Sequence, residues 1–437
     1  MAHKRPRQFA PVLFVAVAVL ALAACGRQYP NSTFDHTTDF NTAVDALWDR
    51  LLLLGTIVFV FVEALLVYTI VRFRKREGAP APRQVHGHAG LEVAWTAIPV
   101  VILALIAVPT VRTIFKTQAK APAGALEVEV IGHQWWWEFR YPSLGVVTAN
   151  ELYLPAGRTA NFSLRTRDVV HSFWAPELGG KRDLITNRTN YLWYTPKDSL
   201  AGSVYNGFCT EYCGTSHANM RIRVYVVTPD QFASWAAHQK TPAAGSLASA
   251  TAGAARIARG LGAAGVAGAP RAAVLPTPAP AAANGDGYVF PREQLPRHAV
   301  AGTPLPAGIA FDDALLAQGD AARGRDLVTN LANLGKAQCR TCHVIGGEPS
   351  LLPRGDDDAK GPNLTHVASR HTIAAGVYNF DARTLARWIK NAPAMKPGSI
   401  MPPQGLGEYY AVTKSRMPVG LTDREIADVV AYLMSLK

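Results

Sequence analysis

One stretch decides how this chain is interpreted: Cys209-Thr210-Glu211-Tyr212-Cys213-Gly214-Thr215-Ser216-His217-Ala218-Asn219-Met220. Within twelve positions it holds two thiols, an imidazole and a thioether, which is the soft ligand set that copper selects. A site for a single blue copper ion needs one cysteine, whereas two neighbouring cysteines can each bridge two metal ions. We therefore expect a dinuclear copper site, to which His171 in the upstream segment His171-Ser172-Phe173-Trp174 adds a second imidazole.

Two other interpretations of this stretch stay open. A disulfide between Cys209 and Cys213 is allowed if the domain lies in an oxidising compartment. A zinc site is the other alternative, but zinc rarely uses methionine, and its structural sites prefer four cysteine or histidine ligands. Because His217 and Met220 complete the copper set, copper is the favoured interpretation.

A second motif, Cys339-Arg340-Thr341-Cys342-His343, has the spacing of a c-type haem attachment site. The two thiols would form thioether bonds to the haem, and His343 would be an axial ligand of the iron. The alternative is a chance or metal-binding C-x-x-C pair. The surrounding segment resembles a small class-I cytochrome c, with Gly361-Pro362-Asn363-Leu364 similar to the loop that follows the haem helix in that family.

The sixth iron ligand in such a domain is expected to be a methionine. Met395, Met401 and Met417 compete for this position. Met401 lies in Lys396-Pro397-Gly398-Ser399-Ile400-Met401-Pro402, which resembles the methionine loop of the cytochrome family, so we predict Met401 and keep Met417 as its rival.

Length and composition predict several units, some in a membrane. The chain has 437 residues, of which 49% are hydrophobic, and this content suits a mixture of membrane segments and soluble domains. Its formal charge is +12, but the basic residues form no stripe interleaved with aromatics, so we expect no nucleic-acid partner. Its five cysteines fall as one single and two close pairs, unlike a disulfide framework.

The N-terminus has the layout of an export signal over residues 1–24, with a basic start and an apolar core too short to span a bilayer. Its ending, Leu22-Ala23-Ala24-Cys25, resembles the lipobox of bacterial lipoproteins, in which the cysteine is acylated. We therefore predict lipid attachment at Cys25, with an ordinary signal sequence as the alternative.

Residues 25–120 are predicted to form a transmembrane α-hairpin. Apolar runs at about 47–71 and 93–113 each reach the ~20 residues needed to cross the hydrocarbon core. The Arg/Lys-rich segment 72–83 between them belongs in the cytoplasm by the positive-inside rule. Everything after residue 115 is then extracytoplasmic, which predicts a multi-pass protein of the bacterial inner membrane with periplasmic domains.

Three further units follow the hairpin. Residues 121–239 contain short alternating stretches such as 126–131, and these predict a β-sandwich or barrel. Residues 240–308 are dominated by Ala, Gly and Pro and predict a flexible or semi-extended linker, with a weak helix at 250–264. Residues 309–437 predict an all-α cytochrome domain, with a helix over 314–331 and a last helix that begins with the capping box Thr422-Asp423-Arg424-Glu425.

These motifs together resemble a known family. The run Gly132-His133-Gln134-Trp135-Trp136-Trp137-Glu138-Phe139, the His171 segment and the cysteine loop are similar to subunit II of haem–copper cytochrome c oxidases, over about residues 40–235. The resemblance implies a cupredoxin-like domain that holds the dinuclear copper centre CuA. By position, its ligands would be the following: His171, Cys209, Cys213, His217, Met220 and the backbone carbonyl of Glu211.

The resemblance implies roles for three more residues. The Glu211 side chain would reach a magnesium or manganese ion shared with subunit I. Trp135 matches the aromatic that accepts electrons from cytochrome c, although a packing role is the alternative. Glu92 matches an acidic residue at the mouth of a proton pathway, although a carboxylate at a helix start is also favoured by the helix dipole.

The predicted function is therefore electron transfer in a terminal oxidase. Electrons would pass from cytochrome c, including the fused haem, to the copper pair and then to the oxygen-reducing subunit I. Subunit I and subunit III are the expected protein partners in the membrane. The tether raises the effective concentration of the haem donor. The alternatives are the CuA subunit of a nitric oxide reductase and a copper-carrying lipoprotein without enzymatic activity, whereas a quinol oxidase subunit would lack these copper ligands.

Overall fold

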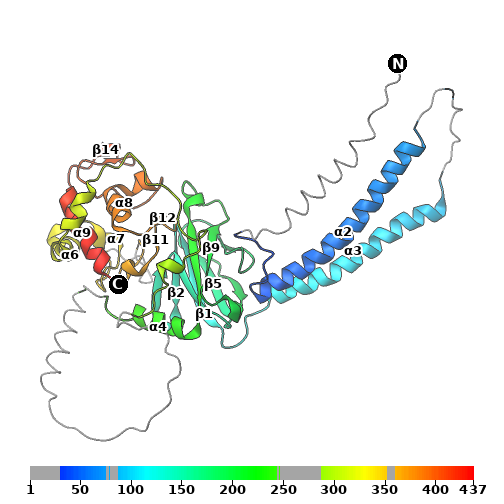
Figure 1. The fold of residues 1–437 in the computed structure, drawn as a ribbon, viewed down its shortest axis with the longest axis horizontal. Coiled ribbons are helices and arrows are strands. Elements are labelled where there is room, and N and C mark those ends of the chain that lie inside the picture. Colours follow the sequence, from blue (N-terminus) through cyan, green and yellow to red (C-terminus); the bar gives the residue numbers. More distant parts are fainter. Residues whose placement is uncertain (1–29, 75–77, 79–86, 244–245, 247–286, 352–359) are drawn as a thin grey trace, which may run out of the picture.

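The computed structural model describes residues 30–74, 78, 87–243, 246, 287–351 and 360–437. Figure 1 shows a long helical hairpin, a β-sandwich and a small helical domain, with the sandwich between the other two. The predicted signal sequence, the lipid site at Cys25 and the weak helix at 250–264 lie outside the described residues.

Two apolar helices, α2 (Asp39–Arg72) and α3 (Ala89–Gln118), confirm the predicted hairpin and extend each apolar run at both ends. Both are longer than the ~20 residues that a bilayer requires. The side chain of Thr38 caps α2, and that of His88 caps α3. Most apolar side chains of both helices are exposed, so the described residues of this chain do not bury the hairpin.

Hydrogen bonds fix the outer end of α2 to the sandwich. The Thr38 hydroxyl donates to the Leu178 carbonyl at 2.7 Å, and the Asn41 amide donates to the Glu177 carbonyl at 2.8 Å. The Asp39 carboxylate accepts from the backbone N–H of Thr195 at 2.9 Å. The soluble part is therefore held directly on the extracytoplasmic end of the hairpin.

The predicted sandwich is confirmed as two five-stranded sheets, ordered β3-β2-β1-β5-β8 and β4-β10-β9-β6-β7. Most neighbours are antiparallel, but β1 pairs with β5, and β4 with β10, in parallel. The strands are β1 (Leu126–His133), β2 (Trp136–Tyr141), β3 (Val146–Ala149), β4 (Glu151–Pro155), β5 (Ala160–Thr166), β6 (His171–Trp174), β7 (Arg182–Leu184), β8 (Asn190–Tyr194), β9 (Ser203–Cys209) and β10 (Arg221–Val227).

Aromatic side chains fill the space between the two sheets. Trp137, Phe139 and Phe162 are fully buried, and all three lie near Phe173 of β6, the strand that begins with His171. Such pairs contribute packing energy beyond their buried area, which makes the base of the metal site rigid. Helix α4 (Pro229–Gln239) closes one end of this core.

The described part of the expected linker from residue 287 to Ala301 is packed rather than flexible. Phe290 and Ala299 are 1% and 2% exposed and belong to the core of the sandwich. The side chain of Asn206 donates to the His298 carbonyl at 3.0 Å, and His298 in turn contacts the Val204 carbonyl. This part of the 240–308 expectation is corrected, because two apolar side chains in an Ala/Pro-rich background are enough to dock the segment.

One buried ion pair inside the sandwich makes its stability depend on pH. Glu138 lies 3.0 Å from the ring of His133 and accepts from Arg140 at 2.5 Å. Burial alone would raise the pKa of Glu138, but the hydrogen bond from His133 and the charge of Arg140 outweigh it and hold the pKa below its usual value. A carboxyl with a lowered pKa stabilises the fold above its unfolded pKa, and that contribution is lost as pH falls through the folded pKa.

We therefore expect the substitution Glu138→Gln to lower the free energy of unfolding by about 1–3 kcal/mol at pH 7. The deficit relative to the unsubstituted chain should shrink below about pH 4.3 and vanish once Glu138 is protonated in the folded chain too. Thermal unfolding of the full chain in detergent, followed by circular dichroism at several pH values, measures this. A deficit that stayed constant down to pH 3 would contradict the assignment.

The C-terminal domain is helical, as predicted, and its last helix α9 (Asp423–Ser435) begins with the predicted capping box. Thr422 accepts from the Glu425 N–H, and the Glu425 carboxylate accepts from the Thr422 N–H. The helix expected over 314–331 is broken instead, because Asp320 caps a new helix there. The other helices are α6 (Ala321–Thr329), α7 (Cys339–Cys342) and α8 (Ala382–Met395), with two short hairpins β11 (Thr372–Ile373)–β12 (Tyr378–Asn379) and β13 (Tyr409–Tyr410)–β14 (Ser415–Arg416).

Candidate metal and haem centres

The fold brings the predicted copper ligands together from three places. His171 begins β6, Cys209 ends β9, and the loop after Cys209 returns at Met220, directly before β10. The donor atoms follow one another at short distances: His171 Nδ1 to Cys209 Sγ 3.8 Å, Cys209 Sγ to Cys213 Sγ 3.7 Å, Cys213 Sγ to His217 Nδ1 3.6 Å, Cys213 Sγ to Met220 Sδ 3.9 Å and Cys209 Sγ to the Glu211 carbonyl 3.3 Å.

The two thiols do not form a disulfide. Their sulfur atoms are 3.7 Å apart, whereas a disulfide bond is about 2.05 Å long. No disulfide joins any of the four cysteines in the described part of the chain. Five side-chain donors and a carbonyl around two facing thiols exceed the four ligands of a structural zinc site and include a thioether. The donor set therefore fits two copper ions.

The protonation state of the two thiols is also consistent with the binding of positively charged metal ions. The pKa of Cys209 is lowered to about 4, chiefly because its sulfur accepts a hydrogen bond from the Cys213 thiol and also from His171. The pKa of Cys213 is raised, because the neighbouring sulfur already carries the charge and burial disfavours a second one. The protein thus stabilises one thiolate by itself, and only added positive charge between the sulfurs would stabilise both.

Sequence reasoning missed the residue that orients His171. Asp168 accepts from His171 Nε2 at 2.8 Å, which turns Nδ1 toward the cysteines. The other oxygen of Asp168 accepts from the backbone N–H of Gln134 at 2.7 Å. Metal-binding histidines are commonly held by a carboxylate in this way. The spacing Asp168-x-x-His171 was the available signal.

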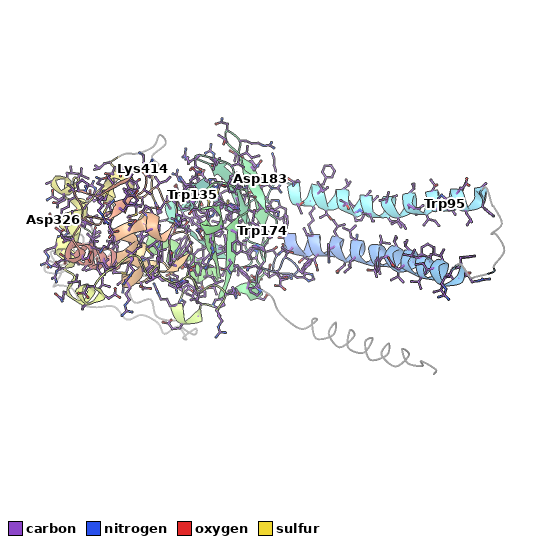
Figure 2. All side chains as sticks on the ribbon, turned by 90° about the horizontal axis from the view of Figure 1, so that it is seen from above. Trp95, Trp135, Trp174, Asp183, Asp326 and Lys414 are labelled. Atoms are coloured by element: carbon purple, nitrogen blue, oxygen red, sulfur yellow. The ribbon has the colours of Figure 1, made fainter. Side chains whose placement is uncertain are left out.

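Trp135 lies directly beside the copper loop. Its indole N–H donates to the Cys213 carbonyl at 2.9 Å, and the Gln134 side chain donates to the same carbonyl at 2.8 Å. Figure 2 shows Trp135 at the boundary between the sandwich and the C-terminal domain. Its aromatic ring thus adjoins the predicted metal site on one side and faces the second predicted cofactor site on the other.

The predicted haem residues line one cavity, most of whose wall belongs to the C-terminal domain. Cys339, Cys342, His343 and Met401 all line it, together with apolar side chains such as Leu433. His343 Nδ1 bonds to the Pro362 carbonyl at 2.7 Å, so Nε2 remains as the ring nitrogen available to iron. Burial lowers the pKa of His343, which keeps the imidazole neutral, as a metal ligand requires.

Gly361 shows how tightly the histidine is held. A Cβ atom at this position would lie 2.4 Å from the His343 ring, so only glycine allows the loop to pass. The loop that resembles the one after the haem helix therefore supplies both a hydrogen bond and close contact to His343. The residues present fit a covalently attached haem.

Among the three competing methionines, the described structure brings Met401 to the cavity wall. Met395 is buried in a separate cluster with Tyr378 and Ile309. Met417 directly follows the β13–β14 hairpin, and its N–H donates to the Glu408 carbonyl at 2.8 Å.

We expect Met401→Ala to abolish the charge-transfer band of a methionine–iron bond and to lower the reduction potential of the haem, because a thioether ligand favours the reduced state. Met417→Ala is the matched control and should change neither quantity. Absorption spectra and a potentiometric titration of the purified complex measure both. The opposite pattern in the two variants would assign the ligand to Met417.

The haem cavity is shared between two domains, which the sequence did not predict. Its wall includes Gln134, Trp135, Trp136 and Asn150 of the sandwich as well as the cytochrome residues. Trp136 is stacked on His133, with ring centroids 4.1 Å apart, so this wall is rigid. No local motif signals such a contact between residues more than 200 positions apart.

Two predicted functional carboxylates lie away from these centres. The Glu211 side chain is exposed, although its backbone carbonyl faces Cys209. Glu92 lies in the first turn of α3, at the end remote from the sandwich, where it accepts from the His88 N–H at 3.3 Å. This contact matches the helix-start alternative, and a proton role for Glu92 stays a prediction.

Comparison with known families agrees with this arrangement. Three family models match in order: the transmembrane domain of cytochrome c oxidase subunit II over residues 32–113, its periplasmic domain over 143–227, and cytochrome c over 321–437. A cytochrome c oxidase subunit 2 of Bacillus subtilis is 33% identical over 246 residues, which cover 52% of this chain and 68% of that protein. The chain belongs to the cytochrome c oxidase subunit II family.

Other relatives extend the match along the chain. The subunit 2 of Alkalihalophilus pseudofirmus is 25% identical over 392 residues, covering 87% of this chain and 83% of the relative. A crystal structure of the periplasmic domain of subunit II from Bradyrhizobium japonicum is 28% identical and covers 28% of this chain and 97% of its own, with a TM-score of 0.26. Family membership makes the chain a subunit of a terminal oxidase with a CuA copper domain, a haem-bearing cytochrome c domain and a membrane anchor, associated with subunit I.

Proposed function

We propose that the chain is the electron-transfer subunit II of a respiratory oxidase, receiving electrons at its own haem and delivering them through a dinuclear copper centre to the oxygen-reducing subunit I. When bound, the haem and the copper pair supply one-electron carriers. One observation carries the proposal: Trp135 lines the haem cavity and also donates to the carbonyl of Cys213. A single side chain thus connects the two cofactor sites.

The proposed ligands follow from the two sites. The thioether attachment points of the haem are Cys339 and Cys342, and its axial ligands are His343 and Met401; all four residues line the same cavity. The copper ligands share one chain of donor contacts at 3.3–3.9 Å. They are His171, Cys209, Cys213, His217, Met220 and the Glu211 carbonyl.

Side chains around these ligands hold them in place. Asp168 fixes His171 through a hydrogen bond, and Pro362 fixes His343 in the same way. Fixed ligands reduce the rearrangement that accompanies a change of charge, because preorganised groups need not move when the charge arrives. The protein's part in the transfer is therefore to hold both sites rigid and adjacent.

The proposal extends to the surroundings of the chain. The exposed carboxylate of Glu211 is available to a magnesium or manganese ion shared with subunit I, and Glu92 is the proposed opening of a proton pathway. The exposed apolar faces of α2 and α3 support contact with lipid and with subunits I and III in a bacterial inner membrane. Cys25 is the proposed lipid attachment site, outside the described residues.

The test uses the purified oxidase complex. Rapid reduction of the haem by a stoichiometric donor should be followed by reduction of the copper centre and then by consumption of oxygen. Copper that stays oxidised while the haem is reduced would contradict the proposal. Consumption of nitric oxide in place of oxygen would support the reductase alternative, and copper without attached haem would support the carrier alternative.

A further inference from the structure

The segment Lys396-Pro397-Gly398 connects the haem side of the molecule to the copper side. It begins directly after α8 and ends three residues before Met401. It also touches the sandwich at Trp135 and at the copper loop. The same short piece of chain therefore contacts the surroundings of both cofactor sites.

Lys396 makes the strongest of these contacts. Its side chain is buried at 4% exposure, and its Nζ donates to the Trp135 carbonyl at 2.6 Å and to the Ala374 carbonyl at 3.1 Å. Burial lowers the pKa of Lys396 to about 7, but the neutral amine still carries two N–H groups for the two carbonyls. A buried lysine is costly unless it is hydrogen-bonded, so this position serves more than packing.

The two residues that follow reach the copper loop. The Pro397 carbonyl accepts from the hydroxyl of Ser216, which is fully buried next to His217. At Gly398, where φ is +85°, a Cβ atom would lie 2.9 Å from the Trp135 ring and 3.1 Å from Thr215. Glycine is required there because any side chain would push the segment off the indole.

Other contacts join the two domains without involving Lys396. The Glu151 carboxylate accepts from the N–H groups of His371 and Thr372 at 2.8 and 2.9 Å, and Arg223 donates to the Gly376 carbonyl at 3.3 Å. These bonds lie around the β11–β12 hairpin. They can hold the domains together while the segment beside Trp135 is altered.

We propose that Lys396 is a positioning residue for electron transfer: it holds the segment that leads to Met401 against the backbone of Trp135 and so fixes the haem cavity over the indole. This inference rests on the proposed function. It assigns to a lysine of the cytochrome domain the alignment of two sites that lie on different domains.

The test compares Lys396→Met with Lys390→Met in the purified oxidase complex. Methionine is close to lysine in length but cannot donate to the two carbonyls. Lys390 lies on α8, the helix that ends directly before Lys396, and its bonds to Asp423 and to the Ala310 carbonyl stay within the cytochrome domain, so it is the matched control. After rapid reduction of the haem, transfer to copper should slow about tenfold or more in Lys396→Met and stay unchanged in Lys390→Met.

Further measurements distinguish positioning from general damage. Haem content, copper content and the methionine–iron band should be unchanged in Lys396→Met, while the transfer rate should become sensitive to solvent viscosity because the loosened segment must find its position by diffusion. Loss of the methionine–iron band would overturn the proposal, since Lys396 would then act through iron ligation. A transfer rate equal to that of the unsubstituted complex would also overturn it.

A second variant keeps the inference testable if Lys396→Met does not assemble. Gly398→Ala adds one methyl group at an exposed position, pushes the segment off Trp135 and leaves Lys396 in place, so it should slow the same step. An unchanged rate in this variant would contradict the inference. Failure of the unsubstituted complex to pass electrons from haem to copper would instead contradict the proposed function.

Discussion

Replacing Cys213 by serine is expected to abolish the near-infrared absorption of the copper centre and to reduce oxidase activity to background. Cys213 lies at the centre of the candidate ligands, because its sulfur is within 3.6–3.9 Å of Cys209, His217 and Met220. A serine hydroxyl is a hard ligand with a far higher pKa and does not bridge two copper ions. Metal analysis and absorption spectra of the purified complex measure the loss.

The haem spectrum shows whether the substitution Cys213→Ser affects only the copper site. This spectrum and the haem content should be unchanged in Cys213→Ser, since no haem residue contacts this sulfur among the described contacts. Substitution of the exposed neighbour Tyr212 by phenylalanine is the control and should leave copper in place. Copper absorption that survived in Cys213→Ser would refute the ligand assignment.

Replacing Trp135 by leucine is expected to slow electron transfer from haem to copper by about 100-fold, with both cofactors retained. The indole occupies the wall between the haem cavity and the Cys213 carbonyl, and leucine supplies neither the ring nor the N–H donor. Transient absorption after rapid reduction of the haem measures the rate directly. Steady-state oxygen consumption should fall in proportion if this step becomes limiting.

Trp193→Leu is the matched control for this variant. Trp193 also uses its indole N–H for one backbone carbonyl, that of Ala119 at 2.8 Å, but it lies on β8 beside the membrane hairpin. Its loss should leave the haem-to-copper rate unchanged. Equal slowing in both variants would mean that Trp135 acts only through the stability of the sandwich.

The sequence predicted those features whose chemistry is local. The haem motif is five consecutive residues, and the copper loop is twelve, so spacing alone brings most of the donors together. The membrane hairpin could also be predicted from the sequence, because a membrane-spanning helix is recognised by the hydropathy of about 20 consecutive residues. The last helix was marked by its capping box at Thr422.

Features that depend on distant pairs were not predictable in this way. The spacing Asp168-x-x-His171 is local, but it did not by itself show that the Asp168 carboxylate turns toward the His171 ring. The contact of Lys396 with Trp135 joins residues 261 positions apart, and the docking of Phe290 depends on a hydrophobic space in another domain. The expected helix over 314–331 failed for a local reason, since Asp320 competes for backbone N–H groups and starts a new helix.

The packing of Phe290 and Ala299 in the sandwich determines where a soluble copper-domain fragment can end. A fragment that stopped at residue 239, where the sandwich ends by its strands and helix α4, would leave the site of Phe290 open beside Tyr225. A soluble copper-domain fragment should therefore extend to about residue 300 if it is to stay folded and soluble. A truncation anywhere between residues 240 and 289 would remove Phe290 and Ala299 together with the cytochrome domain, and so would leave the interior of the sandwich incomplete.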